Sequence, residues 1–206
     1  MAFNINADIV DIRSDIPKST DNFLVDSNVW YWLGYTKASI NALAHQITHY
    51  PHYLNQAVVT GSGLYKSALS FAELAHIIER SEHEIFNTSQ GMTISKKDFR
   101  HNDPTERANV LLEIEHAWVL VDALTGGRTI DVHLNNALVN LSLQHIKVAG
   151  LDGYDSFMLE SLLQAGITQV ITDDGDFGSV GGITVFTANS NLIHEARKQK
   201  KLISSR

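Results

Sequence analysis

Short apolar runs alternate with stretches of helical periodicity along the whole chain. Runs suited to buried strands lie at residues 23–25, 64–69, 168–172 and 183–187, and residues 129–134 alternate between apolar and polar side chains. Apolar residues at helical spacing predict helices over residues 40–50, from residue 73 onward, and over residues 105–124, 137–145 and 155–164. Strands that alternate with helices are typical of a parallel sheet covered on both faces, so we predict an α/β protein.

Two of these helices carry specific expectations. Residues 105–124 show the most regular 3.6-residue period, and Gly126 supplies a stop signal just beyond it. The helix at residues 40–50 is expected to pack on the sheet through the apolar positions Ile40, Leu43, Ala44 and Ile47.

The composition fits one domain. The chain has 206 residues, 44% of them hydrophobic, which is enough to fill a large core. We predict a single domain over residues 22–206, with a polar N-terminal arm at residues 1–21 and a polar insertion of loop and short helix at residues 82–103. The absence of cysteine excludes disulfides and zinc-thiolate sites. Because there is also no apolar leader and no membrane-length apolar run, we expect a cytoplasmic protein without a membrane partner.

Acidic residues stand where strands are expected to end or helices to begin. Asp26, Asp174 and Asp176 follow apolar runs, and Glu73 and Asp155 lie at expected helix starts. In an open α/β sheet the carboxyl ends of parallel strands meet at one edge, so these side chains can share a pocket. Clustered carboxylates need cations, and hard oxygen ligands without cysteine favour Mg²⁺ or Mn²⁺. The pattern predicts a metal-binding site of the kind that hydrolyses phosphodiester bonds.

Each acid also has an ordinary structural explanation. Asp26 can start an Asx turn, and Glu73 favours the helix dipole in any first turn. Asp152 and Asp155 fit the N-cap and N3 positions of one helix, and we assign the capping role to Asp152. Residues 173–176 can form a simple turn. The combination of all these acids, rather than any one of them, favours a shared site.

The net charge of −7 argues against a polynucleotide partner, because phosphate binding normally requires Lys and Arg. Leaving the five candidate metal-site carboxylates out of the count changes the net charge from −7 to −2, which weakens the objection. Basic residues do gather at Lys96, Lys97 and Arg100 and again in residues 197–201. Either group can contact a nucleic-acid backbone, and either can equally be a solvated surface.

Two other groups of residues have competing interpretations. His45, His49 and His52 follow the i, i+4, i+7 spacing of one helical face, as in a zinc site, but Pro51 interrupts the pattern. The aromatic residues 30–32 can stack nucleic-acid bases, although core packing behind the first strand is the favoured interpretation.

The ordered set of acids resembles the PIN-domain family. The resemblance lies in residues 23–28, 67–74, 155–159 and 172–177, and it spans most of the chain. It implies a three-layer α/β/α sandwich on a parallel sheet and a Mg²⁺- or Mn²⁺-dependent endoribonuclease, a hydrolase that cuts RNA. Many bacterial members are the toxins of toxin-antitoxin pairs.

The resemblance also implies roles and partners. The catalytic, metal-site acids are matched by Asp26, Glu73, Asp155 and Asp174, the accessory metal-site acid by Asp176, and the polar residues that orient them by Ser27, Asn28 and Thr172. The implied partners are an RNA substrate, a cognate antitoxin and a second copy of the chain. The alternative is a PIN-like module that binds RNA or protein without cutting. A phosphatase on a similar sheet is disfavoured, because Asp26-Ser27-Asn28 stands where an Asp-x-Asp motif is expected.

Overall fold

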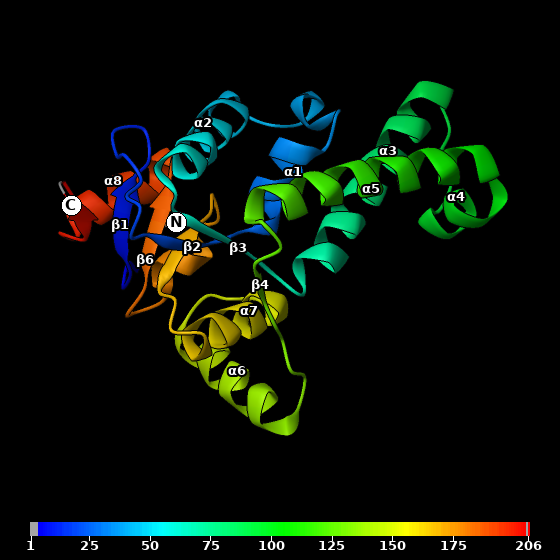
Figure 1. Ribbon diagram of the computed structural model, residues 1–206. Coiled ribbons are helices and arrows are strands. Elements are labelled where there is room, and N and C mark those ends of the chain that lie inside the picture. The colour runs from blue at the N-terminus through cyan, green and yellow to red at the C-terminus, as the bar shows by residue number, and fades with distance from the viewer. Residues whose placement is uncertain (1–3, 205) are drawn as a thin grey trace.

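A parallel β-sheet forms the centre of the molecule (Figure 1). The structure is a computed structural model, and it describes residues 4–204 and 206. Within these residues the sheet has seven strands in the order β4-β3-β2-β5-β6-β1-β7. The strands are β1 (Asp8–Asp11), β2 (Asn22–Val25), β3 (Gly63–Ser67), β4 (Thr129–Ile130), β5 (Gln169–Ile171), β6 (Thr184–Thr187) and β7 (Leu202–Ile203).

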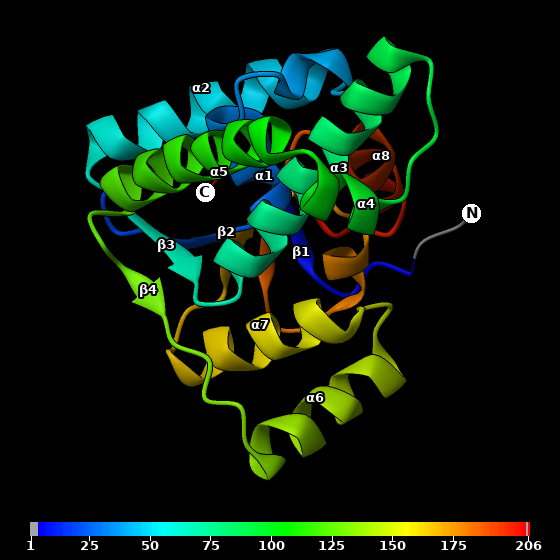
Figure 2. The same cartoon turned by 90° about the vertical axis from the view of Figure 1, so that its right-hand side faces the viewer.

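Helices cover both faces of this sheet (Figures 1 and 2). The α-helices are α1 (Ser27–Gly34), α2 (Ala44–Thr60), α3 (Ser70–Gln90), α4 (Lys96–Asn102), α5 (Pro104–Thr125), α6 (Asn136–Val148), α7 (Gly153–Gln164) and α8 (Ser190–Lys198), and the 3₁₀ helices are η1 (Ala38–Ile40) and η2 (Asp176–Ser179). Helices α1, α2, α3 and α5 form one outer layer, and α7 and α8 lie on the opposite face. Helix α6 packs on α7 rather than on the sheet. The predicted three-layer α/β/α architecture is confirmed.

Side-chain alternation along the strands explains the two layers. In β2, Phe23 and Val25 point into the hydrophobic core under α1, α2 and α5, whereas Leu24 points into the core under α7 and α8. All three side chains are almost completely buried. A strand that is apolar on both faces reads as a continuous apolar run, which is why this strand could be recognised from three residues.

Helix α2 differs from the helix that was expected over residues 40–50. Ile40 and Leu43 precede α2, and they are 60% and 61% exposed rather than packed on the sheet. The helix instead buries Tyr50, Tyr53 and Leu54, and it continues through an internal proline to Thr60. Tyrosine can occupy this inner face because each hydroxyl finds a partner: Tyr50 donates to Asp173 and Tyr53 donates to Asp15.

The predicted arm and insertion are also different in the structure. Residues 8–11 form β1, which pairs in parallel with β6 on one side and β7 on the other, so this segment belongs to the sheet. Its apolar core is only Ile9 and Val10 between two aspartates, too short a run to stand out. Residues 82–90 continue α3 as helix, and the expected short helix is α4. The strand expected at residues 129–134 has only two residues.

The strand order places β2 beside β5 at the middle of the sheet. From β2 the chain proceeds to β3 on one side, and from β5 it proceeds to β6 on the other. Such a switch point opens a crevice beyond the carboxyl ends of the two strands, where ligands bind in open α/β sheets. No helix in the described part of the chain is both long and apolar enough to cross a membrane.

Candidate functional site

Asp26 lies directly beyond β2, at the N-cap of α1. Its backbone N–H donates to the carbonyl of Ile171 (3.0 Å) and continues the β2–β5 pairing. Its carboxylate accepts a hydrogen bond from the Thr172 hydroxyl (2.6 Å) and is only 6% exposed. Burial, with the nearby charge of Asp174, raises the pKa of Asp26 to about 6. Asp26 therefore caps a helix, as a turn-forming residue would, but it also buries a charge that no cationic side chain neutralises in these contacts.

Glu73 lies in the first turn of α3 and reaches toward the same place. Its carboxylate accepts a hydrogen bond from the hydroxyl of Ser27, the first residue of α1, at 2.6 Å. Burial, with the charges of Asp26 and Asp152, raises the pKa of Glu73 to about 7. Ser27 thus joins Glu73 to the start of α1.

Helix α7 contributes two acids. Asp152 is its N-cap, as predicted, and accepts a hydrogen bond from the backbone N–H of Asp155 (2.9 Å). Burial, with the charges of four neighbouring acids of which Asp26 contributes most, raises the pKa of Asp155 to about 9. Asp155 is therefore the carboxyl group that is hardest to ionise at this edge of the sheet.

The loop after β5 contributes Asp174. The Thr172 hydroxyl that donates to Asp26 also accepts a hydrogen bond from the Asp174 backbone N–H (2.9 Å), so one threonine joins both acids. Asp174 in turn accepts a hydrogen bond from the backbone N–H of Asp176 (2.9 Å). Burial raises the pKa of Asp176 too, but its side chain does not line the cavity described next.

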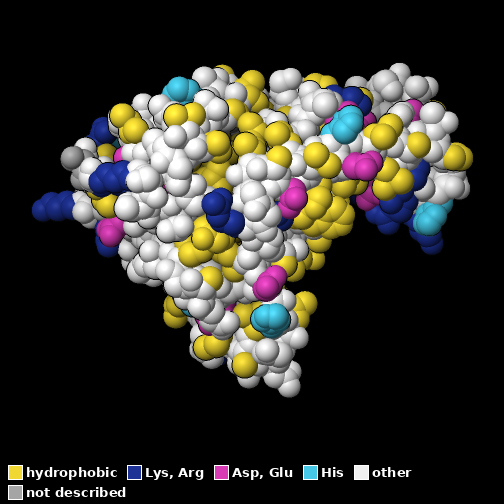
Figure 3. All heavy atoms as spheres, viewed as in Figure 1, with side chains coloured by type: hydrophobic (Ala, Val, Ile, Leu, Met, Phe, Trp, Pro, Cys, Tyr) yellow, Lys and Arg dark blue, Asp and Glu magenta, His cyan; other side chains and the backbone are white. Residues whose placement is uncertain are grey.

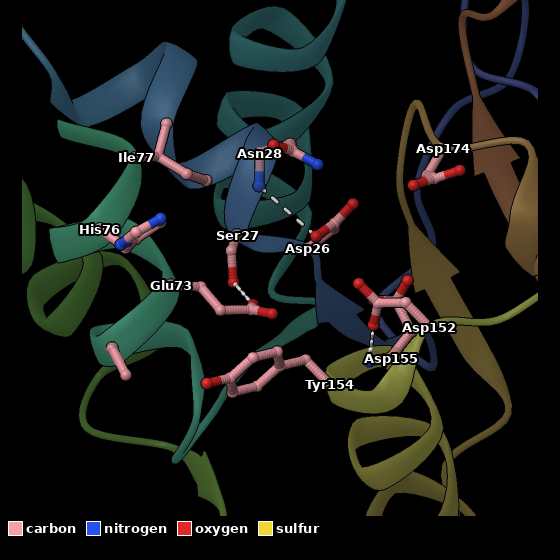
Figure 4. Close-up of a pocket in the computed structure, with 11 residues that line it drawn as sticks. Asp26, Ser27, Asn28, Glu73, His76, Ile77, Asp152, Tyr154, Asp155 and Asp174 are labelled. Carbon is pink, nitrogen blue, oxygen red and sulfur yellow. Dashed lines mark hydrogen bonds between the residues drawn. The ribbon is translucent and has the colours of Figure 1, made fainter. Parts of the chain in front are cut away.

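The acids of these elements line one cavity of about 380 Å³ (Figure 4). Asp152, Asp155 and Asp174 lie on one side of it and Glu73 on the other, with Asp26 between them. The complete lining is Asp26, Ser27, Asn28, Ala72, Glu73, His76, Ile77, Asp152, Tyr154, Asp155 and Asp174. Four of the five predicted metal-site acids are therefore brought together, and the accessory acid Asp176 is not among the residues that line the cavity.

Three polar lining residues were not predicted as members of the site. The sequence predicts only a capping role for Asp152, but its carboxylate both caps α7 and lines the cavity. His76 lies three residues after Glu73, a spacing that places both on one helical face and was available as a signal. Tyr154 follows Asp152 in the first turn of α7, and nothing in its sequence context indicates the cavity.

The donor set fits a hard divalent cation. Among the described residues, no three His, Asp or Glu side chains converge closely enough to hold a metal ion directly. Mg²⁺, however, usually keeps several waters and takes only one or two carboxylates as direct ligands. Asp26 is buried, and Glu73 and Asp155 are partly buried. Their pKa values are raised by loss of hydration and by the charges of neighbouring acids, and a bound cation would relieve this repulsion.

Asp173 points away from the cavity and fastens its loop to α2. Its carboxylate accepts hydrogen bonds from Gln46 (2.8 Å) and Tyr50 (2.7 Å), and His45 contacts it at 3.0 Å. Asn189 donates to its backbone carbonyl (2.7 Å). The backbone between Thr172 and Asp174 is thereby fixed from the side opposite the acids, and His45 has a carboxylate partner rather than a place in a three-histidine site.

Tyr50→Phe is expected to lower the free energy of unfolding by about 1–3 kcal/mol, because the buried hydroxyl donates to Asp173 and accepts from the Ala188 backbone N–H (3.0 Å). Urea unfolding monitored by circular dichroism measures the change. Tyr65→Phe is the matched control, since no hydrogen bond of the Tyr65 hydroxyl exists within the described residues, and it should change stability by less than about 0.5 kcal/mol. Equal effects of the two substitutions would contradict the role of Tyr50.

The aromatic and basic candidates occupy different positions. Trp30 is completely buried and Tyr31 is 7% exposed, which confirms core packing for both, whereas Trp32 is partly exposed. Arg100 binds the Glu79 carboxylate, so its charge is already compensated. Lys96 and Lys97 are exposed on α4. Figure 3 shows Lys and Arg side chains gathered over α4 and again near α8, at opposite edges of that face.

Comparisons with known proteins do not identify a family for this chain. No protein-family model matches the chain, and a search of curated proteins finds no significant match.

Proposed function

We propose that this protein is a divalent-metal-dependent nuclease of the PIN type, and specifically an endoribonuclease. One observation carries the proposal: acids that follow β2 and β5, together with acids at the starts of α3 and α7, line a single cavity at the switch point of a parallel sheet. The pKa values of three of them are raised by burial and mutual repulsion. Carboxyl groups with pKa values raised in this way cluster at functional sites, whereas helix caps and turns alone do not require them.

The polar side chains at the site have two roles: some would bind the metal, and the others orient the metal-binding carboxylates. Asp26, Glu73, Asp155 and Asp174 would hold Mg²⁺ or Mn²⁺, directly or through its waters. When bound, the metal supplies an activated water and neutralises charge on the phosphate and leaving oxygen. Ser27 orients Glu73, and Thr172 orients Asp26 while fixing the Asp174 backbone. Asn28 donates its backbone N–H to Asp26 at 3.4 Å and lines the cavity, and Asp176 supports Asp174 from outside it.

The order of the acids along the chain, on a three-layer α/β/α fold, supports the PIN resemblance and with it the choice of RNA as substrate. The same resemblance extends the proposal to a toxin role, with a cognate antitoxin and a second copy of the chain as partners. Purification from the native host tests this extension: a small protein that copurifies in fixed ratio supports it, and a free chain argues for a processing nuclease.

The nuclease proposal is tested by incubating purified protein with structured and single-stranded RNAs in Mn²⁺. We expect cleavage that EDTA stops and that renewed Mn²⁺ restores. Asp26→Asn protein, purified in parallel, should cut none of the RNAs, which controls for contaminating ribonucleases. If wild type and Asp26→Asn both fail to cut but bind RNA equally well, the protein is the non-cleaving module instead.

A further inference from the structure

A second hollow of about 290 Å³ adjoins the acidic cavity. It is lined by Asn28, Tyr31, Trp32, Asn41, Ala42, Ile77, Arg80, Ser81 and Glu84. Asn28 and Ile77 line both hollows, so the two are neighbours on either side of this pair of side chains. Figure 4 shows Asn28 and Ile77 together at the upper rim of the acidic cavity, which is where the second hollow begins.

One face of α3 runs through both hollows. Glu73, Ile77, Arg80 and Glu84 follow each other at spacings of three or four residues, which places them on successive turns of the same face. At a rise of 1.5 Å per residue, Arg80 lies about 10 Å along the helix from Glu73. The helix thus places the backbone of Arg80 two turns from Glu73, on the side of the acidic cavity where the second hollow lies.

Arg80 is available to bind an anion. Its side chain is 53% exposed, and it meets Glu84 at 3.9 Å, the limit of an ion pair. Exposed pairs of this kind contribute little, and a phosphate can displace or join them at low cost. Arg100 and Arg107 are different, because both bind the buried carboxylate of Glu79.

Trp32 supplies a flat apolar wall in the same hollow. Its indole is partly exposed, and it packs on Tyr50 with ring centroids 5.4 Å apart. The hydroxyls of Tyr31 and Ser81 contact each other at 2.9 Å and join α1 to α3 in the wall of the hollow. A fixed aromatic ring beside a cation is the combination with which proteins bind single-stranded nucleic acid, through base stacking and phosphate contact.

We propose that the second hollow binds a nucleotide of single-stranded RNA next to the scissile phosphate, with its base on Trp32 and a phosphate on Arg80. The proposal rests on the proposed nuclease function and specifies its substrate. A base must leave its helical stack to lie on an indole, so paired RNA is excluded from the hollow. The neighbouring phosphodiester then lies toward Asn28 and the acids, which sets the position of the cut relative to the bound base.

The test measures binding separately from cutting. In the Asp26→Asn background with Mn²⁺, a fluorescein-labelled, unstructured 12-nucleotide RNA is titrated and followed by anisotropy. Arg80→Gln should raise Kd about fivefold or more and reduce the slope of log K against log salt by about 0.7, the value for one lost phosphate contact on a single strand. Lys147→Gln removes one exposed positive charge from α6, outside both hollows, and should leave Kd within about twofold. Equal losses in the two variants would overturn the proposal.

Trp32 is tested with Trp32→Leu, and with Trp32→Phe in case the leucine variant does not fold. Loss of stacking should raise Kd on the order of 5- to 100-fold for leucine and less for phenylalanine. A duplex of the same sequence should bind at least about tenfold more weakly than the single strand. Cleavage that is unaffected by Arg80→Gln and Trp32→Leu would reject this hollow while keeping the nuclease. RNA binding that depends on both residues, without any cleavage in wild type, would reject the nuclease while keeping the hollow.

Discussion

Asp155→Asn is expected to stabilise the metal-free protein and to abolish its cleavage of RNA. Burial and four neighbouring acids raise the pKa of Asp155 to about 9, so ionisation of this group is much easier in the unfolded chain than in the folded one. Asparagine has nearly the same shape and no charge, which removes this advantage of the unfolded state. We expect the Tm in EDTA at pH 8 to rise by roughly 3–8 °C, since about 1 kcal/mol moves the Tm of a domain this size by about 2–4 °C.

Cleavage should fall by at least about 100-fold in the same variant, because the proposed site loses one of its metal-binding carboxylates. Asp131→Asn removes an exposed aspartate outside the cavity, and it should change the Tm by no more than about 1–2 °C and leave cleavage intact. Thermal unfolding and initial cleavage rates, measured on the three proteins side by side, separate the two effects. A lower Tm for Asp155→Asn would contradict the electrostatic argument, and full activity would place Asp155 outside the catalytic site.

Stability gained by removing a functional group is the expected behaviour of a site whose residues are arranged for chemistry rather than for folding. Thr172 illustrates the arrangement. Its hydroxyl donates to Asp26 and accepts from the Asp174 backbone, which brings two carboxylates together that would otherwise repel each other. Asp173 lies between Thr172 and Asp174 in the sequence, but its carboxylate binds Gln46 and Tyr50 of α2 instead of lining the cavity.

The acids at strand ends were predictable because backbone geometry alone determines where they meet. Asp26 and Asp174 follow β2 and β5, and neighbouring parallel strands deliver such residues to one edge of the sheet. Glu73 and Asp155 were predictable for a related reason, since each lies in the first turn of a helix that starts at that edge. Asp176 fitted the same pattern but begins η2, whose turn directs it away from the cavity.

The second hollow could not be predicted from sequence, because it depends on how helices cross. Trp32 and Arg80 lie on α1 and α3, and only the packing between these helices brings them to the same hollow. The inner face of α2 was missed for a similar reason. Its apolar positions near residue 43 fit a helical period, but the hydroxyl partners that permit burial of Tyr50 and Tyr53 come from distant segments.

Mg²⁺ is expected to stabilise the wild-type protein strongly at pH 8 and weakly at pH 5. The folded pKa values of Asp26, Glu73 and Asp155 are raised to about 6, 7 and 9, above their ordinary values of 3.8 to 4.5. Below about pH 4 these groups are protonated in both states and cost nothing. As the pH rises, the unfolded chain releases its protons first, so the metal-free protein loses stability between about pH 4 and pH 9.

A divalent cation is expected to reverse this loss by binding the ionised carboxylates of the folded state. At a concentration 100 times its Kd, a ligand adds about 2.7 kcal/mol, or roughly 5–10 °C in Tm for a domain of this size. At pH 5 protons compete for the same oxygens, and the shift should fall to less than about 2 °C. Differential scanning fluorimetry with MgCl₂, matched in ionic strength by NaCl, measures both shifts. Equal shifts at the two pH values, or a shift that persists in Asp155→Asn, would mean that the cation binds somewhere other than among these acids.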